Sequence, residues 1–220
     1  MQLNKFLEKI EWLESSHPYG GACIRINNEN VLYFDPSHLS EKNMKIKADL
    51  ILITHSHEDH FSVKNLEKLV KPTTIIVCPE DCEEVLIQNH FTFNIYSMRS
   101  NESIKLHNIQ IKTFPAYSST AHPKSAGWLG YIIEVYGFKL YHSGDSGFIS
   151  EMKNLKNIDI AFLTVRDPYM MSPKELVQAI TAFKPKIIIP IHWIEVEKDD
   201  IYYIKDNAPK TTKVIILKAK

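Results

Sequence analysis

Residues 49–60 read Asp-Leu-Ile-Leu-Ile-Thr-His-Ser-His-Glu-Asp-His, an apolar run followed at once by side chains that can bind metal ions. The run 49–54 has the length and continuity of a β-strand that is covered on both faces. Four metal-competent side chains then fall within six residues: His55, His57, Asp59 and His60. We predict a turn at the carboxyl end of the strand, where side chains two positions apart converge on one ion while the next two reach a second. Imidazole nitrogens and carboxylate oxygens are ligands that Zn²⁺ favours, and Mn²⁺ or Fe²⁺ can use the same set.

Two further apolar runs end in residues of the same kind. Asp145 follows the run Phe-Lys-Leu-Tyr-His-Ser-Gly that begins at Phe138, and His192 follows the run Lys-Ile-Ile-Ile-Pro-Ile that begins at Lys186. In α/β sheets, functional groups gather beyond the carboxyl ends of the strands. Three strand ends that carry metal-type ligands favour one shared site over three unrelated ones. For residues 54–60 alone, the alternative is a polar loop that is rich in histidine by chance.

The order of the remaining elements is that of a mixed α/β chain in which β-hairpins precede β-α-β units. We predict one hairpin from residues 22–26 and 31–35 and a second from residues 130–135 and 138–142. Ser62 is the expected N-cap of a helix over residues 62–70. The other predicted elements are strands at 74–77, 158–164, 186–190 and 214–217, three short strands within 93–115, and helices at 80–89 and 173–183. Because no repeat or flexible linker divides the chain, we predict a single domain over residues 1–220.

Composition narrows the function classes. Lys plus Arg and Asp plus Glu both number 26, so the chain lacks the global positive charge of a nucleic-acid binder, and no nucleic acid is expected as a partner. No apolar run approaches the ~18 residues of a membrane span, so no stable membrane insertion is expected. The three cysteines, Cys23, Cys78 and Cys82, form no disulfide framework, which favours a reducing cytoplasm. The oligomeric state stays open, with a homo-oligomer among the options.

The motif His55-Ser56-His57-Glu58-Asp59-His60 matches the His-x-His-x-Asp-His signature of the metallo-β-lactamase superfamily, which the chain resembles over roughly residues 12–192. Tyr33-Phe34-Asp35-Pro36 is similar to an early strand of that family, and Tyr141-His142-Ser143-Gly144-Asp145 and Pro190-Ile191-His192 are similar to its later ligand-bearing strand ends. The resemblance is most specific to small cytoplasmic metal-dependent hydrolases, through Ala116-Tyr117, His122-Pro123-Lys124, Gly127-Trp128-Leu129-Gly130 and Met171-Ser172-Pro173. It implies an α/β chain with the family's four-layer αβ/βα sandwich.

The resemblance also implies two sets of metal ligands. The first ion would take His55, His57 and a third histidine, the second would take Asp59, His60 and His192, and Asp145 would bridge both. His122 is the candidate for the third histidine, although the family often places this residue nearer the preceding strand, where Tyr117 stands. The alternative for His122 is a surface histidine beside Pro123.

His142 stands three residues before Asp145. We expect it to hydrogen-bond a metal ligand, with direct ligation as the alternative. The remaining histidines lie in polar or loop-like contexts. His17 and His38 lie near strands expected to approach the site and could line it. We expect His90 and His107 to be ordinary histidines without a role in the site.

Together these residues predict a hydrolase that carries two divalent ions, with zinc favoured over manganese or iron. Two such ions can share a water and lower its pKa, and the bridging hydroxide would attack a small-molecule phosphodiester, lactone, thioester or amide. Asp59, Asp145 and His142 are the candidate catalytic residues. Lys124 and Arg166 are candidate anion-binding groups, with ordinary surface cations as the alternative. A non-catalytic, metal-dependent ligand-binding or sensing protein is the competing function.

Overall fold

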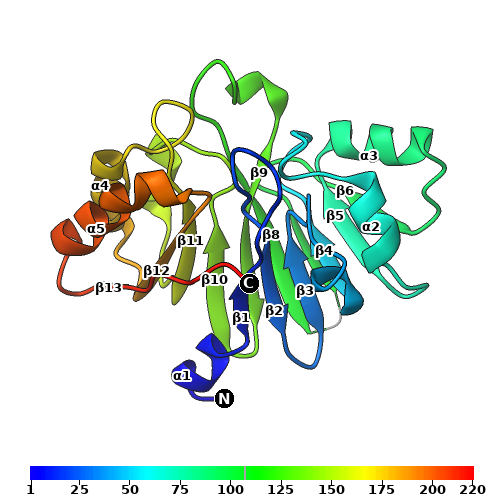
Figure 1. Cartoon of the computed structure of the whole chain (residues 1–220), viewed down its shortest axis with the longest axis horizontal. Coiled ribbons are helices and arrows are strands. Elements are labelled where there is room, and N and C mark those ends of the chain that lie inside the picture. Colours follow the sequence, from blue (N-terminus) through cyan, green and yellow to red (C-terminus); the bar gives the residue numbers. More distant parts are fainter. Residues whose placement is uncertain (107) are drawn as a thin grey trace. The chain divides into compact units, whose positions relative to one another are not determined.

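The computed structural model describes residues 1–106 and 108–220, and it divides the chain into two compact units. The N-terminal unit comprises Met1–Arg99 together with Leu217–Lys220, and the C-terminal unit comprises Ser100–Ile216. Each unit is built on one mixed β-sheet with its own helices and hydrophobic core (Figure 1). The α/β class is confirmed, and the single domain over residues 1–220 stays a prediction.

The sheet of the N-terminal unit has the order β1-β2-β3-β4-β5-β6. Its first three strands are antiparallel and the later ones are parallel to β3. The predicted first hairpin is confirmed, because β2 pairs with β3 and Ile24 lies opposite Phe34. The bounds of the elements are α1 Leu3–Leu7, β1 Ile10–Trp12, β2 Ile24–Asn27, β3 Val31–Phe34, η1 Asn43–Lys45, β4 Leu50–Leu52, α2 Val63–Leu69, β5 Ile75–Cys78, α3 Glu80–Gln88 and β6 Asn94–Ser97.

Local sequence explains where these elements begin and end. All three residues of β4 are buried, as the continuous apolar run predicts. The Ser62 hydroxyl accepts a hydrogen bond from the Asn65 backbone N–H and so caps α2 as predicted. Pro79 ends β5 and precedes α3, which separates Cys78 in the strand from Cys82 in the helix.

The sheet of the C-terminal unit has the order β13-β12-β11-β10-β9-β8-β7. Strands β7 to β10 are antiparallel, and β10 to β13 are parallel. The predicted second hairpin is confirmed. The predicted elements at 158–164, 173–183 and 186–190 form a β-α-β unit. The bounds are β7 Ser103–Leu106, β8 Ile109–Pro115, η2 Lys124–Ala126, β9 Leu129–Val135, β10 Phe138–His142, η3 Ser150–Asn154, β11 Ile160–Thr164, α4 Pro173–Phe183, β12 Ile187–Ile191, η4 Glu195–Glu197, α5 Lys198–Asn207 and β13 Lys213–Val214.

The end of the chain departs from the predicted strand at 214–217. Strand β13 covers only Lys213–Val214, and one more ladder bond joins the Ile215 N–H to the Ile188 carbonyl. Leu217 already belongs to the N-terminal unit, where Lys220 pairs with β1 through the Trp12 carbonyl. The apolar run 214–217 is therefore divided between the two units and does not form one strand.

Parallel pairing of β10, β11 and β12 sets up the candidate site in the C-terminal unit. The carboxyl ends of parallel strands lie at the same edge of a sheet, so the segments after His142, Thr164 and Ile191 are neighbours (Figure 1). Among the described residues, no helix combines the length and the apolarity that a bilayer crossing requires.

Candidate metal centre

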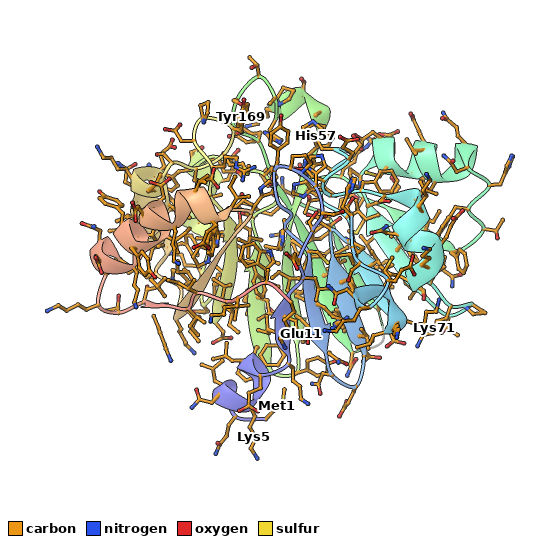
Figure 2. All side chains as sticks on the ribbon, in the orientation of Figure 1. Met1, Lys5, Glu11, His57, Lys71 and Tyr169 are labelled. Carbon is orange, nitrogen blue, oxygen red and sulfur yellow. The ribbon has the colours of Figure 1, made fainter. Side chains whose placement is uncertain are left out.

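The turn after β4 brings the four predicted side chains of the N-terminal unit together. The His57 carbonyl accepts hydrogen bonds from the N–H groups of His60 and Phe61, at 3.0 and 2.8 Å, which closes the turn. The Nε2 atom of His55 lies 3.1 Å from Nδ1 of His57, and Nε2 of His60 lies 3.8 Å from Oδ2 of Asp59. His55 and His60 are buried, whereas His57, labelled in Figure 2, is partly exposed.

A buried carboxylate orients one of these histidines directly. Asp35 follows β3, and its Oδ2 atom accepts a hydrogen bond from Nδ1 of His60 at 2.9 Å. Both side chains are fully buried. Because the proton of His60 resides on Nδ1, its Nε2 atom carries a lone pair, which is the form that a metal ion requires.

The same carboxylate orients a second histidine through Thr54. The Thr54 hydroxyl donates to Oδ2 of Asp35 at 2.7 Å, so its oxygen can accept from Nδ1 of His55 at 2.9 Å. The Thr54 N–H donates to Oδ1 of Asp35, which uses the other carboxylate oxygen. His55 therefore also presents an unprotonated Nε2. The sequence singled out Asp35 only through the resemblance of residues 33–36 to an early strand of the family, and the orienting roles of Asp35 and Thr54 were not predicted.

The C-terminal unit brings together the other three predicted ligands. His122 lies in the segment after β8, Asp145 follows β10, and His192 follows β12. The Oδ2 atom of Asp145 lies 3.3 Å from Nε2 of His122 and 3.7 Å from Nε2 of His192. All three side chains are buried. One carboxylate oxygen thus faces two imidazoles.

A backbone carbonyl sets the tautomer of His122. Nδ1 of His122 lies 3.2 Å from the carbonyl oxygen of Tyr169, a residue labelled in Figure 2, and a carbonyl can only accept. The Ser118 hydroxyl donates to the same carbonyl. With the proton on Nδ1, the other ring nitrogen, Nε2, is the atom that faces Asp145 and is the one available to bind a metal ion. An imidazole nitrogen and a carboxylate oxygen that face each other in this way are a donor pair that a divalent cation could bind.

His142 supports the backbone beside Asp145. It is fully buried, and its Nδ1 atom accepts a hydrogen bond from the Gly144 N–H at 3.1 Å. The Gly144 carbonyl accepts from the hydroxyls of Ser143 and Thr164, at 2.8 and 2.7 Å. A hydrogen bond from His142 to a metal ligand itself stays a prediction.

The other sequence-derived candidates have different surroundings. The Tyr117 hydroxyl donates to Glu151 at 2.9 Å, and Lys124 forms an ion pair with the same carboxylate at 3.0 Å. Lys124 is exposed, as the surface-cation alternative expects, but Arg166 is buried and paired with Glu197. Both candidate anion-binding groups therefore already contact a carboxylate of the protein.

Two of the remaining histidines lie next to the turn after β4. Nε2 of His17 lies 3.2 Å from Oε1 of Glu58, and the rings of His17 and His38 are 4.9 Å apart. His90 is exposed, as expected for an ordinary histidine without a role in the site. His107 lies outside the described residues.

The donor chemistry in both units fits a divalent ion of the zinc type. The donors are imidazole nitrogens and carboxylate oxygens, they are mostly buried, and hydrogen bonds to the opposite ring nitrogen prepare His55, His60 and His122 for ligation. Buried imidazole and carboxylate donors at the strand ends of an α/β fold place the chain in the class of metal-binding α/β proteins.

Comparison with known proteins gives the family. Residues 10–192 match the model of the β-lactamase superfamily domain. The chain is 32% identical to a UPF0173 metal-dependent hydrolase of Thermococcus onnurineus over 214 residues, which cover 90% of this chain and 94% of the relative. It is 29% identical to a UPF0173 metal-dependent hydrolase of Enterococcus faecalis, over 80% of this chain and 84% of the relative.

Solved structures agree with this assignment. A proposed metal-dependent hydrolase from Parabacteroides distasonis superposes with a TM-score of 0.80 at 27% identity, covering 96% of this chain and 93% of its own. A metallo hydrolase from Ignicoccus hospitalis shares the fold, with a TM-score of 0.74 at 19% identity, over 95% of this chain and 94% of its own. The chain belongs to the metal-dependent hydrolases of the β-lactamase superfamily. The predicted family, the metallo-β-lactamase fold and the enzyme class are confirmed.

Proposed function

We propose that this enzyme is a binuclear hydrolase that cleaves an ester-type bond of a small molecule: a phosphodiester, lactone, thioester or amide. The proposed ligands of the first ion are His55, His57 and His122, and those of the second are Asp59, His60 and His192, with Asp145 shared. The observation that carries this proposal is the position of Oδ2 of Asp145, which faces one histidine from each proposed set, His122 and His192. A carboxylate in that position is suited to bridge two ions.

When bound, two divalent ions supply an activated water and polarise the oxygen of the scissile bond. The protein residues position that chemistry. Asp59 and Asp145 contribute negative charge, and Asp59 can accept a hydrogen bond from the attacking water and so orient it. Asp35 keeps His55 and His60 in the ligating tautomer, and His142 holds the Gly144 peptide beside Asp145.

Zinc is the proposed metal, since imidazole nitrogens and carboxylate oxygens are ligands that zinc favours, and manganese or iron would fit the same donors. The proposed location is the cytoplasm. All three cysteines are free and buried, which a reducing compartment favours.

The test combines metal analysis with a substrate panel. Purified protein is loaded with excess Zn²⁺, Mn²⁺ or Fe²⁺, freed of unbound metal, and assayed on chromogenic phosphodiester, lactone, thioester and amide substrates. We expect two ions per chain and turnover of one substrate class. A loaded protein that holds one ion at most would contradict the binuclear assignment. Two bound ions with tight substrate binding and no turnover would instead favour a sensing protein.

A further inference from the structure

We propose that Arg166 is a positioning residue for His192, acting through a partly buried ion pair with Glu197. This inference rests on the proposed function, because it concerns how the C-terminal unit holds one of the proposed metal ligands. Arg166 follows β11 by two residues, and His192 follows β12 by one. These strands are adjacent and parallel, with Thr164 opposite Ile191, so both residues leave the same edge of the sheet.

The backbone conformation at His192 must be held in place by the surrounding residues. Its φ is +64°, in the left-handed region that residues other than glycine adopt only when their surroundings enforce it. The chain therefore turns sharply at the ligand. A left-handed backbone also sets the direction of the side chain, which here brings Nε2 of His192 to 3.7 Å from Oδ2 of Asp145.

Glu197 closes the turn that follows His192. Its Oε2 atom accepts the Ile194 N–H at 2.8 Å, and the Glu197 N–H donates to the Ile194 carbonyl at 2.8 Å. The Trp193 indole N–H donates back to the Pro190 carbonyl at 3.2 Å, on the other side of the ligand. The residues on both sides of His192 are thus held by hydrogen bonds.

Arg166 fixes Glu197 in turn. Its Nε and its terminal nitrogen donate to the two carboxylate oxygens at 3.0 and 3.1 Å, a two-point contact that sets the orientation of the carboxylate as well as its distance. The Arg166 side chain is only 7% exposed and that of Glu197 is 24% exposed. The guanidinium is therefore shielded from solvent, and the carboxylate is partly shielded.

The segment that carries Arg166 also holds the other histidine of this unit. The Tyr169 carbonyl accepts from His122, while the Arg166 carbonyl accepts the N–H groups of Tyr169 and Met170 at 3.0 and 2.8 Å. One loop therefore orients His122 through a backbone carbonyl and His192 through an ion pair. This assigns Arg166 to the support of metal ligands and not to substrate anions.

The first test uses the metal-free protein and reads the amide hydrogen exchange of Ile194 by NMR. The variants are Arg166→Met, Arg166→Lys and Glu197→Gln. Arg166→Lys keeps the charge but not the two-point contact, and Glu197→Gln keeps an acceptor for the Ile194 N–H. We expect Ile194 to lose protection strongly in Arg166→Met and less in the two conservative variants. Wild-type protection in Arg166→Met would overturn the proposal.

The second test titrates the same proteins with Co²⁺ and follows its visible absorption, which reports ligand geometry. We expect Arg166→Met to bind one ion like the wild type and the other about 10–100-fold more weakly, with partial recovery in Arg166→Lys. Lys186→Met is the matched control, because Lys186 forms an exposed ion pair with Asp159 in the same unit. Equal weakening in that control would overturn a specific role of Arg166. Failure of the wild type to bind a second ion would contradict the proposed function instead, and the Ile194 measurement would still test Arg166.

Discussion

Nδ1 of His60 lies 2.9 Å from Oδ2 of Asp35, and neither side chain is exposed to solvent. A fully buried carboxylate needs hydrogen-bond donors from the protein, and here Thr54 and His60 donate three hydrogen bonds to it. Asp35 is therefore tied to the ligand turn in a single arrangement. This arrangement makes the tautomers of two proposed metal ligands, His55 and His60, a property of the folded N-terminal unit.

Substitutions of Asp35 and Thr54 should affect the affinities for the two proposed ions differently. In Asp35→Asn an amide N–H replaces one of the two carboxylate acceptors, so Thr54 and His60 can no longer all donate to this side chain, and the His60 tautomer with its proton on Nδ1 loses stability. We expect this variant to lose affinity for both ions by about 10–100-fold each. Thr54→Val removes only the relay to His55, so it should weaken the first ion and spare the second. Isothermal titration with Zn²⁺ measures both affinities, and identical losses in the two variants would contradict the relay.

Substitution of the shared carboxylate should release one ion before the other. Asp145→Asn keeps the side-chain volume but removes a charge and one good oxygen ligand. We expect loss of the second ion first, because its other ligands include one histidine fewer, and a fall in turnover of several orders of magnitude. Circular dichroism should show an unchanged fold, since the hydrophobic core of a chain this long does not depend on metal. Retention of both ions with near-wild-type turnover would exclude Asp145 as the bridge.

His122 and His142 should respond differently to removal. His122→Ala is expected to lose one ion and nearly all activity, because His122 is a proposed direct ligand. His142→Ala should keep both ions and lose affinity or rate by about 10–100-fold, since its hydrogen bond supports the Gly144 backbone. Tyr117→Phe is a useful third variant, because its hydroxyl donates to Glu151, and it should leave metal content unchanged. Metal analysis of the three proteins decides the assignment, and a reversed order would move the ligand away from His122.

The Glu151 carboxylate should make stability depend on acid pH. Burial acts to raise the pKa of Glu151, but hydrogen bonds from its backbone N–H, Lys124, Tyr117 and Ser150 outweigh this and lower the pKa from 4.5 to about 2. A group whose pKa is lowered in the folded state stabilises the protein above its unfolded pKa, and this contribution is lost as the pH falls through the folded value. Between pH 5 and pH 2, unfolding of the metal-free wild type by urea should therefore become easier by more than in Glu151→Gln. Parallel pH profiles for the two proteins would contradict the lowered pKa.

Local patterns alone predicted much of this protein. The apolar run before His55, the Ser62 cap and the helix that begins with Pro173 are encoded within a few residues, so their positions follow from periodicity and capping chemistry. The sequence also placed the metal-type ligands at strand ends. It missed β1, which has only three residues, and α5, which is polar and buries only Ile201 and Ile204.

Only the tertiary structure decided which partners orient the ligands. Asp35 and His60, which share a hydrogen bond, are 25 positions apart in the sequence. The corresponding separation is 31 positions for Arg166 and Glu197 and 47 for Tyr169 and His122. No local pattern encodes such pairs, because they depend on which strands are neighbours in a sheet and on where each strand ends. The residue types of the proposed metal ligands can therefore be identified from the sequence. Their tautomers and directions follow from long-range hydrogen bonds that exist only once the sheets have formed.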